Sequence, residues 1–570
     1  MSTMPERSVP LHTERDDGSL QRGTNWWGAF VIGLAGTILV TGIAPYAVQS
    51  LGAASIPMFV GVTAAGVLLC FCLAELAAMM PDRTGGLPSY AFETFKPLGA
   101  TTAKHVGGIS GWAYWLGWFP VAPINMILAS AYIVSLFGLP SGRSFLPFGT
   151  FGSPISVTVL VISMVGLIGM LTPALLGIRL GARFATVLGV VSMVPLTALV
   201  FLPLLNPSSM SFANLSGFHL PPGTTGGFPF FMSWIFVMTW SVLAMEAAAC
   251  YIGECRDPAR DAKIAMTAEG LFGFFIYVSI PLVFVLVLGT ATSFDPLTVF
   301  TDFSGRVFNT SSGGLLQWLI GIPLIVALLL SVLNAIMGVG RSLFQVAEDG
   351  LIPRWFMHTN RHGVPDHAMM FNVACSALVV LFGSPLRIYI FSNMGYLLAC
   401  SVALLGYFLH RQLHPELARP VRMHGSLRWF ALAVFVFFMF TWAYGGWRAP
   451  ALVVAPTEGS FLFWAGFGGD RGLPAAVPVA AGGGPPCSSR GRPGAGTRGR
   501  LAGGCPCWEA GDRPGSAYPR DRARCCSLRP ASRSPTRKSG RPSPWQGARR
   551  SPCCPSPACT GRRSASPTQG

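Results

Sequence analysis

Charged residues are scarce in this sequence, since Asp, Glu, Lys and Arg make up 11% of its 570 residues while 51% are hydrophobic. Soluble globular proteins contain about 25% charged residues, which cover the surface that faces water. So little charge indicates a chain whose surface faces lipid. A cleavable secretory signal is also missing, because residues 1–25 are polar and lack a short apolar segment before a cleavage site. We expect these residues to form a disordered cytoplasmic arm.

The common signatures of enzymes are missing as well. We find no phosphate-binding loop, no His/Cys set with metal-ligand spacing and no nucleophile–base pair at a recognisable spacing. Three histidines, His358, His362 and His367, share one polar loop, and their spacing favours solvated side chains over metal ligands. We therefore predict that the protein is not an enzyme and has neither a cofactor nor a metal site.

The net charge of +17 suggests nucleic acid at first, but its distribution argues against such a partner. From Ala465 onward the chain holds 18 Lys and Arg and 4 Asp and Glu, so this part carries +14 and the rest only +3. Eight of the 14 cysteines also lie in this part. The other six lie in or beside apolar segments and are typical of small hydrophobic residues in helices: Cys70, Cys72, Cys250, Cys255, Cys375 and Cys400.

Apolar runs long enough to cross a bilayer, which takes roughly 20 residues, recur along the chain. We predict eleven such helices, at 27–49, 56–80, 109–137, 155–176, 184–205, 228–251, 264–289, 315–340, 367–383, 388–409 and 428–447. With the N-terminus in the cytoplasm, the inner segments hold 18 Lys and Arg and the outer loops hold four. This asymmetry follows the positive-inside rule and supports a multi-pass protein of the cell membrane.

The composition changes abruptly after about Phe467, where Arg, Pro, Gly, Ser and Cys dominate. Such a segment cannot bury enough apolar surface to fold. It is a basic functional tail, a solvated extension, or the product of a shifted reading frame, which we favour. The expected organisation is a disordered arm at 1–25, a core of membrane helices one to eleven at 26–448, a partial twelfth helix at 449–467 and a disordered basic tail at 468–570.

Two predicted helices carry features that a plain span does not need. The first has three glycines and two threonines between Gly33 and Ile43, which fits either close helix packing or a discontinuous helix that offers free backbone N–H groups to an anion. The sixth holds Glu246 within an apolar run, and an intramembrane acid is costly unless it is paired or lines a cavity. Glu246 therefore suits proton coupling or the binding of an ammonium group. Glu75, near the end of the second span, suits a salt bridge to a loop base at least as well as a transport role.

Four motifs, in order and at consistent spacing across residues 25–447, resemble the amino acid–polyamine–organocation (APC) superfamily of permeases, amino acid permease type. They are Ala74–Leu76 with Pro81, Gly85, Gly86 and Tyr90; Gly111–Gly117; Gly253–Arg260; and Arg341–Pro353. The resemblance implies an all-α membrane fold of about 11–12 helices. In it, two inverted five-helix repeats place the substrate between discontinuous helices one and six.

The resemblance also implies a set of site residues. The backbones of Ile38, Thr41 and Gly42 would hold a substrate carboxylate, and Trp240, next to Ser241, would close over the substrate. Glu246 would be the pH-sensitive acid, with Tyr114 and Tyr396 as its gate partners; amphipathic anchoring of these tyrosines is the alternative. The chain departs from the family in having Val40-Thr41-Gly42 where Gly-Ser-Gly is usual, and in lacking a Lys in the fifth span.

The function that follows is secondary active transport of amino acids by alternating access. The partners are then a small amino acid or amine, the lipid bilayer and, as one candidate coupling ion, the proton. The alternatives left open are a polyamine or amine permease or antiporter, a product disabled by its altered C-terminus, and a membrane sensor that binds without transport.

Overall fold

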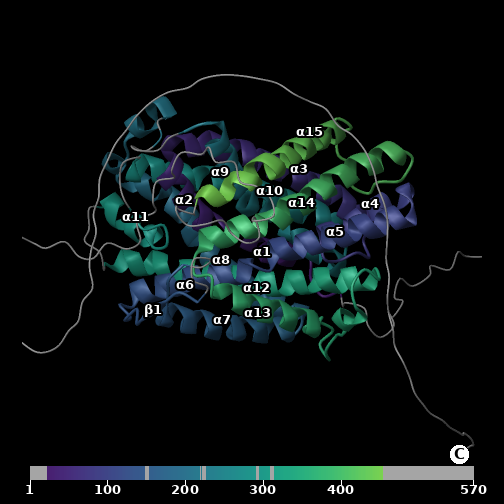
Figure 1. The fold of residues 1–570 in the computed structure, drawn as a ribbon, viewed down its shortest axis with the longest axis horizontal. Helices are drawn as coiled ribbons and strands as arrows, with labels where there is room; N and C mark the ends of the chain where they lie inside the picture. The colour runs from purple at the N-terminus through teal and green to yellow at the C-terminus, as the bar shows by residue number, and fades with distance from the viewer. Residues whose placement is uncertain are drawn as a thin grey trace, which may run out of the picture. The chain divides into compact units, whose positions relative to one another are not determined.

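Helices make up nearly all the regular structure in the computed structural model (Figure 1). The model describes residues 22–147, 153–218, 220, 226–289, 294–308 and 314–452. The α-helices in these ranges are α1 (Trp26–Thr37), α2 (Val40–Leu51), α3 (Ser55–Met79), α4 (Leu87–Phe95), α5 (Ala100–Trp118), α6 (Val121–Leu136), α7 (Val157–Leu175), α8 (Ile178–Phe201), α9 (Phe228–Leu243), α10 (Pro258–Leu288), α11 (Val299–Phe308), α12 (Leu315–Glu348), α13 (Asp366–Val380), α14 (Pro385–Leu413) and α15 (Leu427–Phe440).

Shorter elements connect these helices. The strands β1 (Ser144–Phe145) and β2 (Ile155–Ser156) pair antiparallel. The 3₁₀ segments are η1 (Gly52–Ala54), η2 (Lys96–Leu98), η4 (Leu202–Leu205), η5 (Pro207–Ser209), η6 (Phe212–Phe218), η7 (Ala244–Glu254), η8 (Arg354–Met357) and η10 (Ala449–Leu452), and η9 (Thr441–Gly446) is a π-helical turn. Residues 1–21 of the expected arm, most of the partial twelfth helix and the whole basic tail lie outside the described residues.

The described residues contain nine apolar helical segments long enough to cross a membrane. One of them, Trp26–Met79, covers the first two predicted spans, and α13, with 15 residues, is a shorter apolar helix at the ninth predicted position. Each of the eleven predicted runs lies largely on helix. The expected all-α membrane fold of the APC type is therefore confirmed.

Two helices are interrupted at the positions where the sequence departs from a plain span. Between α1 and α2 the backbone tightens, since the amide of Leu39 donates to Gly36 O at 3.2 Å and that of Thr41 donates to Ile38 O at 3.0 Å. After α9 the chain continues for 11 residues as the 3₁₀ segment η7. Runs of this kind longer than three or four residues are uncommon and often mark a functional hinge.

Polar residues set where the central helices begin. The side chain of Asn25 accepts a hydrogen bond from the amide of Gly28 at the start of α1. Asp257 accepts one from the amide of Arg260 at the start of α10. Each bond satisfies one of the amides that a helix start leaves without a partner. Upstream of Asn25, the amides of Gly23 and Thr24 donate to the carbonyl of Glu254, so the chain just before α1 is tied to the end of η7.

The interrupted helices occupy the centre of the described core. Every residue of α1 from Gly28 to Thr37 is buried, and α1 packs against η7, α8, α10 and α12. Peripheral helices instead expose large apolar side chains, among them Val165 and Ile168 on α7 and Phe430 on α15. An exposed apolar face of this kind suits contact with lipid.

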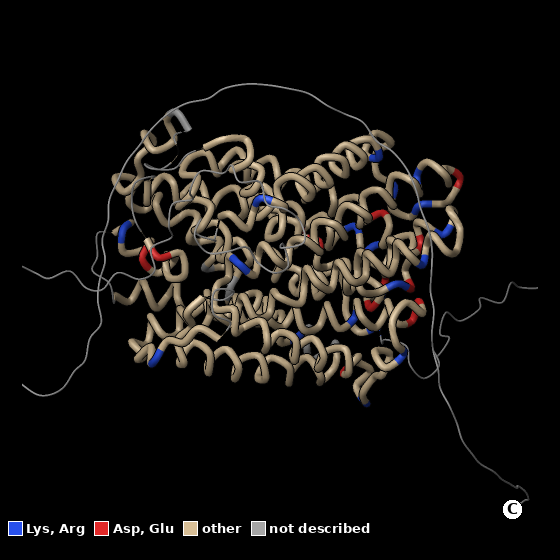
Figure 2. Tube along the Cα trace, in the orientation of Figure 1, with Lys and Arg blue, Asp and Glu red and all other residues tan. Residues whose placement is uncertain are grey.

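Charged residues within the described part gather mainly at one end of the helices, on the right of Figure 2. This end contains the interhelical ion pairs of Arg341 with Glu254 and of Arg83 with Glu93 and Asp349. Burial raises the pKa of the Asp349 carboxyl, and the hydrogen bond from Arg83 opposes that shift. The middle of the bundle keeps few ionisable groups, and these define the candidate site.

Candidate substrate site at the interrupted helices

Glu246 lies on η7 and is completely buried. Its Oε1 accepts hydrogen bonds from the hydroxyl of Tyr396 at 2.9 Å, the hydroxyl of Tyr114 at 3.0 Å and the indole N–H of Trp118 at 3.1 Å. Its Oε2 has no hydrogen-bond partner among the described residues. The three donors hold the carboxylate in one orientation and leave its second oxygen free to bind a ligand.

The three donors also form an aromatic cage around this carboxylate. The rings of Tyr114, Trp118 and Tyr396 lie with their centroids 6.1 to 6.2 Å apart in each pair. Three aromatic rings beside a single acid suit an organic cation, because aromatic rings attract positive charge. The structure brings Tyr114 and Tyr396, the gate partners that the resemblance implied, to Glu246, whereas no role was predicted for Trp118.

Trp240 and Ser241 precede η7 at the end of α9. The indole N–H of Trp240 lies 3.0 Å from Gly117 O and 2.5 Å from the Ser392 hydroxyl, and its ring contacts that of Tyr389 with centroids 4.7 Å apart. The Ser241 hydroxyl lies 2.9 Å from the hydroxyl of Tyr277. Both side chains are buried, so Trp240 lies inside a closed region that links α9 to α5 and α14.

Ile38, Thr41 and Gly42 lie at the junction of α1 and α2, but their amides already have partners. The amide of Ile38 donates to Leu34 O, that of Thr41 to Ile38 O and that of Gly42 to Leu39 O. A substrate carboxylate could bind these amides only after the turn opens. Gly42 faces the hydroxyl of Tyr389, which occupies the space that a Cβ would need.

The junction and η7 approach each other through bare backbone. A Cβ on Gly36 would collide with the carbonyl group of Ala244, so only glycine fits there. The hydroxyl of Tyr277, on α10, lies 3.0 Å from Gly36 O and 2.6 Å from Ser241 O. Tyr277 therefore connects both interruptions, a role that sequence reasoning missed because nothing local to α10 marks it.

A second buried acid, Glu269, contacts the same two segments. Its Oε2 accepts the amide of Ala248, on η7, at 3.0 Å, and its Oε1 has no partner among the described atoms. It packs against Gly33 of α1. Sequence analysis gave Glu269 no role, although its place within an apolar run, between Ala268 and Gly270, was the same signal that marked Glu246.

Glu75 forms the salt bridge that was one of its two expected roles. Its carboxylate accepts hydrogen bonds from Arg411 Nε at 2.8 Å and Nη2 at 2.6 Å, and from Arg419 Nη1 at 2.8 Å. The amide of Met423 also donates to it at 3.0 Å. This network fixes the end of α3 to α14 and to the segment that follows α14, at the charged end of the helices.

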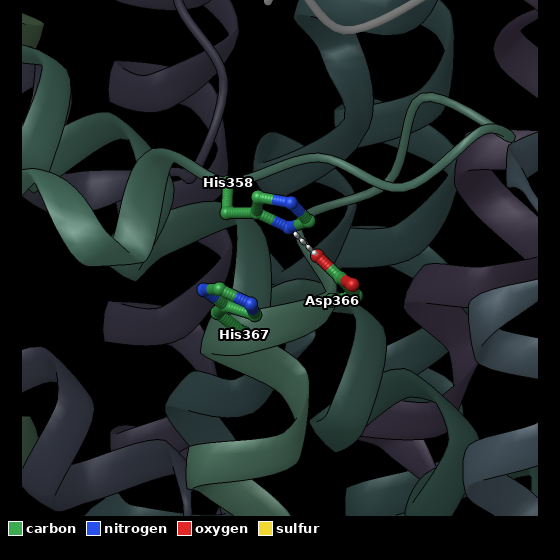
Figure 3. A group of neighbouring side chains, drawn as sticks. All are labelled: His358, Asp366 and His367. Atoms are coloured by element: carbon green, nitrogen blue, oxygen red, sulfur yellow. Dashed lines mark hydrogen bonds and ion pairs between the residues drawn. The ribbon is translucent and has the colours of Figure 1, made fainter.

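Two of the three loop histidines come together with an acid (Figure 3). His358 Nδ1 lies 2.7 Å from Asp366 Oδ1, and the rings of His358 and His367 stack with centroids 4.0 Å apart. His362 instead lies within hydrogen-bond distance of Arg361. One ligand atom from each of His358, Asp366 and His367 lies within 4.8 Å of the other two, so the group could hold a metal ion, although the two imidazoles stack nearly parallel.

The described structure defines an integral membrane protein of the APC type, with interrupted helices around two buried acids. The chain belongs to the amino acid permease family, whose model matches residues 25–464. The chain is 20% identical to the D-serine/D-alanine/glycine transporter of Escherichia coli K12. The match covers 61% of this chain and 74% of that protein. Two plant relatives also match 61% of this chain. The polyamine transporter PUT1 of Oryza sativa subsp. japonica is 24% identical to it, and the match covers 59% of that protein. The vacuolar cationic amino acid transporter 2 of Arabidopsis thaliana is 27% identical, and the match covers 53% of that protein.

Proposed function

We propose that this protein is a secondary active transporter that moves amino acids or related amines across the cell membrane by alternating access, with its N-terminus in the cytoplasm. The observation that carries the proposal is the caged carboxylate of Glu246, with one oxygen held by three donors and the other unpaired. Membership of the amino acid permease family supports the same reading.

The substrate group at this site is an ammonium. A buried carboxylate is costly without a positive partner, and no basic side chain of the described part forms an ion pair with Glu246. An ammonium would supply both the charge and a donor to Oε2, while the rings of Tyr114, Trp118 and Tyr396 would surround it. The relatives named for amino acids and for polyamines transport compounds that share this group.

An amino acid would bring its carboxylate to the opposite side of the site. The junction of α1 and α2 is the other interrupted backbone, and opening its tight turn would free the amides of Thr41 and Gly42. Trp240, near the end of α9, would then cover the bound molecule. Because one caged acid matches one ammonium, a zwitterionic amino acid is the first substrate class to test and a polyamine the second.

Transport also requires the helices to open the site first to one side of the membrane and then to the other. At the charged end, Arg341 and Glu254 join α12 to η7 in a fully buried pair, and Glu75 joins α3 to α14. These contacts close that end, and exchange with the cytoplasm would require them to loosen. The contacts of Trp240 with Gly117 and Ser392 would loosen when substrate leaves the other way.

The test is counterflow in proteoliposomes, in which labelled substrate exchanges for an excess of unlabelled substrate inside. The full chain is compared with Glu246→Gln and, as a matched control, with Glu416→Gln, an exposed acid far along the chain. We expect exchange of one class from a panel of amino acids and polyamines, retained in Glu416→Gln and lost in Glu246→Gln. Binding without exchange by folded native protein would instead favour a sensor, and neither binding nor exchange would favour a disabled product.

A further inference from the structure

Glu269 is a buried acid that the proposed substrate site does not use. It lies about three turns into α10, is completely buried, and keeps one oxygen without a partner among the described atoms. Its other oxygen accepts the amide of Ala248 and so ties α10 to η7. A buried carboxylate with one oxygen left without a hydrogen bond favours a nearby positive charge, and the described residues supply none.

No cation of the described chain supplies that charge. The titratable groups that interact electrostatically with Glu269 are Glu246, Cys250 and Tyr251 on η7 and Cys70 on α3. All four are acids or weakly acidic groups, and the stretch of α1 that covers Glu269 contributes only the backbone of Gly33. The described side chains around Glu269 therefore supply no positive charge.

The space around Glu269 decides which positive charge it takes. A Cβ at Gly33 would lie 2.6 Å from Oε1 and 2.7 Å from Oε2, so the backbone of α1 rests directly on the carboxyl group. A substrate ammonium with its carbon chain does not fit under this backbone, whereas a proton needs no room. The surroundings of Glu246 differ, because three aromatic side chains donate hydrogen bonds to its carboxylate.

We propose that Glu269 binds the coupling proton and that Glu246 binds the substrate's ammonium group. This assignment rests on the proposed transport function. The deprotonated carboxylate accepts the Ala248 amide strongly and holds η7 against α1 and α10. Protonation weakens that charge-assisted bond and frees η7 to move, which links the proton to the segment that carries Glu246.

A cavity at the start of α10 reaches the residue that precedes Glu269 in the sequence. A cavity of about 730 Å³ at the start of the helix is lined by Lys263, Thr267 and Ala268, among other residues, and Ala268 directly precedes Glu269. Water in this cavity would come within a residue or two of the acid along the helix. The carboxyl itself stays out of contact with solvent.

The experiment separates exchange from coupled accumulation in proteoliposomes that contain the full chain. One-to-one coupling predicts about tenfold accumulation of substrate for each unit of pH difference across the membrane. We expect the native protein to reach this ratio and Glu269→Gln to reach a ratio of about one, while its counterflow stays within about twofold of native. Glu416→Gln, at an exposed acid, should match the native protein in both assays.

The outcomes discriminate between the two proposals. Absence of counterflow in the native protein refutes the transport function itself. Normal counterflow with tenfold accumulation in Glu269→Gln overturns only the role of Glu269. If Glu269→Gln does not fold, Glu269→Asp keeps an acid at a shifted position, and the pH profile of its accumulation should differ from the native profile. An identical profile in Glu269→Asp would overturn the assignment.

Discussion

The hydroxyl of Tyr396 lies 2.9 Å from Oε1 of Glu246, although 150 residues separate them along the chain. Trp118 donates to the same oxygen from a third helix, so α5, α14 and η7 meet at one atom. Convergence of three donors on one carboxylate oxygen fixes its orientation and keeps the other oxygen available. The affinity for an ammonium should therefore depend on these donors, although they bind the oxygen that the ligand does not use.

We predict that Tyr396→Phe and Trp118→Phe each weaken substrate binding about fivefold to thirtyfold. Removing one donor to a charged acceptor costs about 1–2 kcal/mol, because the carboxylate loses part of the arrangement that aims it at the ligand. Substrate affinity measured by binding to purified protein checks this. Tyr444→Phe is the control, since the Tyr444 ring packs against Phe440 away from this site. Affinities within twofold of native in both variants would rule out the cage.

The sequence allowed the helices and the first acid to be predicted, for a simple physical reason. Long apolar runs and an asymmetry of loop charge follow directly from the cost of polar groups in lipid, and that cost also marked Glu246. Glu269 could have been found by the same argument. Its run was predicted to begin at residue 264, which placed the acid near a polar end, whereas α10 begins at Pro258.

Other parts of the site depend on packing that no local pattern reveals. Tyr277 reaches Gly36 across 241 residues, and Trp240 meets Ser392 across 152. Either contact requires the positions of at least two helices to be known. Whether the amides of Thr41 and Gly42 are hydrogen-bonded within the turn likewise depends on the conformation of that turn. A run of small residues does not determine this conformation.

The close approach of Gly36 to Ala244 gives a second prediction. In Gly36→Ala the new methyl group collides with the Ala244 carbonyl, and relief of the clash must displace α1 or η7. Such overpacking costs about 1–3 kcal/mol, so we expect a lower melting temperature and loss of counterflow. Gly61→Ala is a matched control, because a Cβ there meets nothing within 4 Å and Gly61 also lies in a membrane helix. Native transport by Gly36→Ala would show that the two segments need not touch.

The buried pair of Arg341 and Glu254 gives a third prediction, on stability. Their side chains are 0% and 1% exposed, and Arg341 joins the end of α12 to the end of η7. Removing one partner leaves a buried charge unpaired, at about 3–5 kcal/mol, whereas removing both leaves none. We expect Arg341→Met and Glu254→Gln each to lower the apparent melting temperature strongly, and the double variant to recover much of the loss. Additive losses in the double variant would mean that the two residues act independently.

The final prediction concerns the basic tail. The family match ends at residue 464 and the described structure at Leu452, so a stop codon after residue 467 keeps all residues of the candidate site and of the family match. The tail removed, residues 468–570, is rich in Arg, Pro, Gly and Cys, a composition from which we predict no apolar core. We therefore expect the truncated chain to match the full chain within about twofold in counterflow per folded protein, and to have the same melting temperature.

Faster exchange after truncation would identify the tail as an inhibitory extension, and loss of exchange would show that it contributes to the working transporter. Measuring both chains in the same vesicles, with folded protein quantified by size-exclusion chromatography, separates these outcomes from a difference in expression.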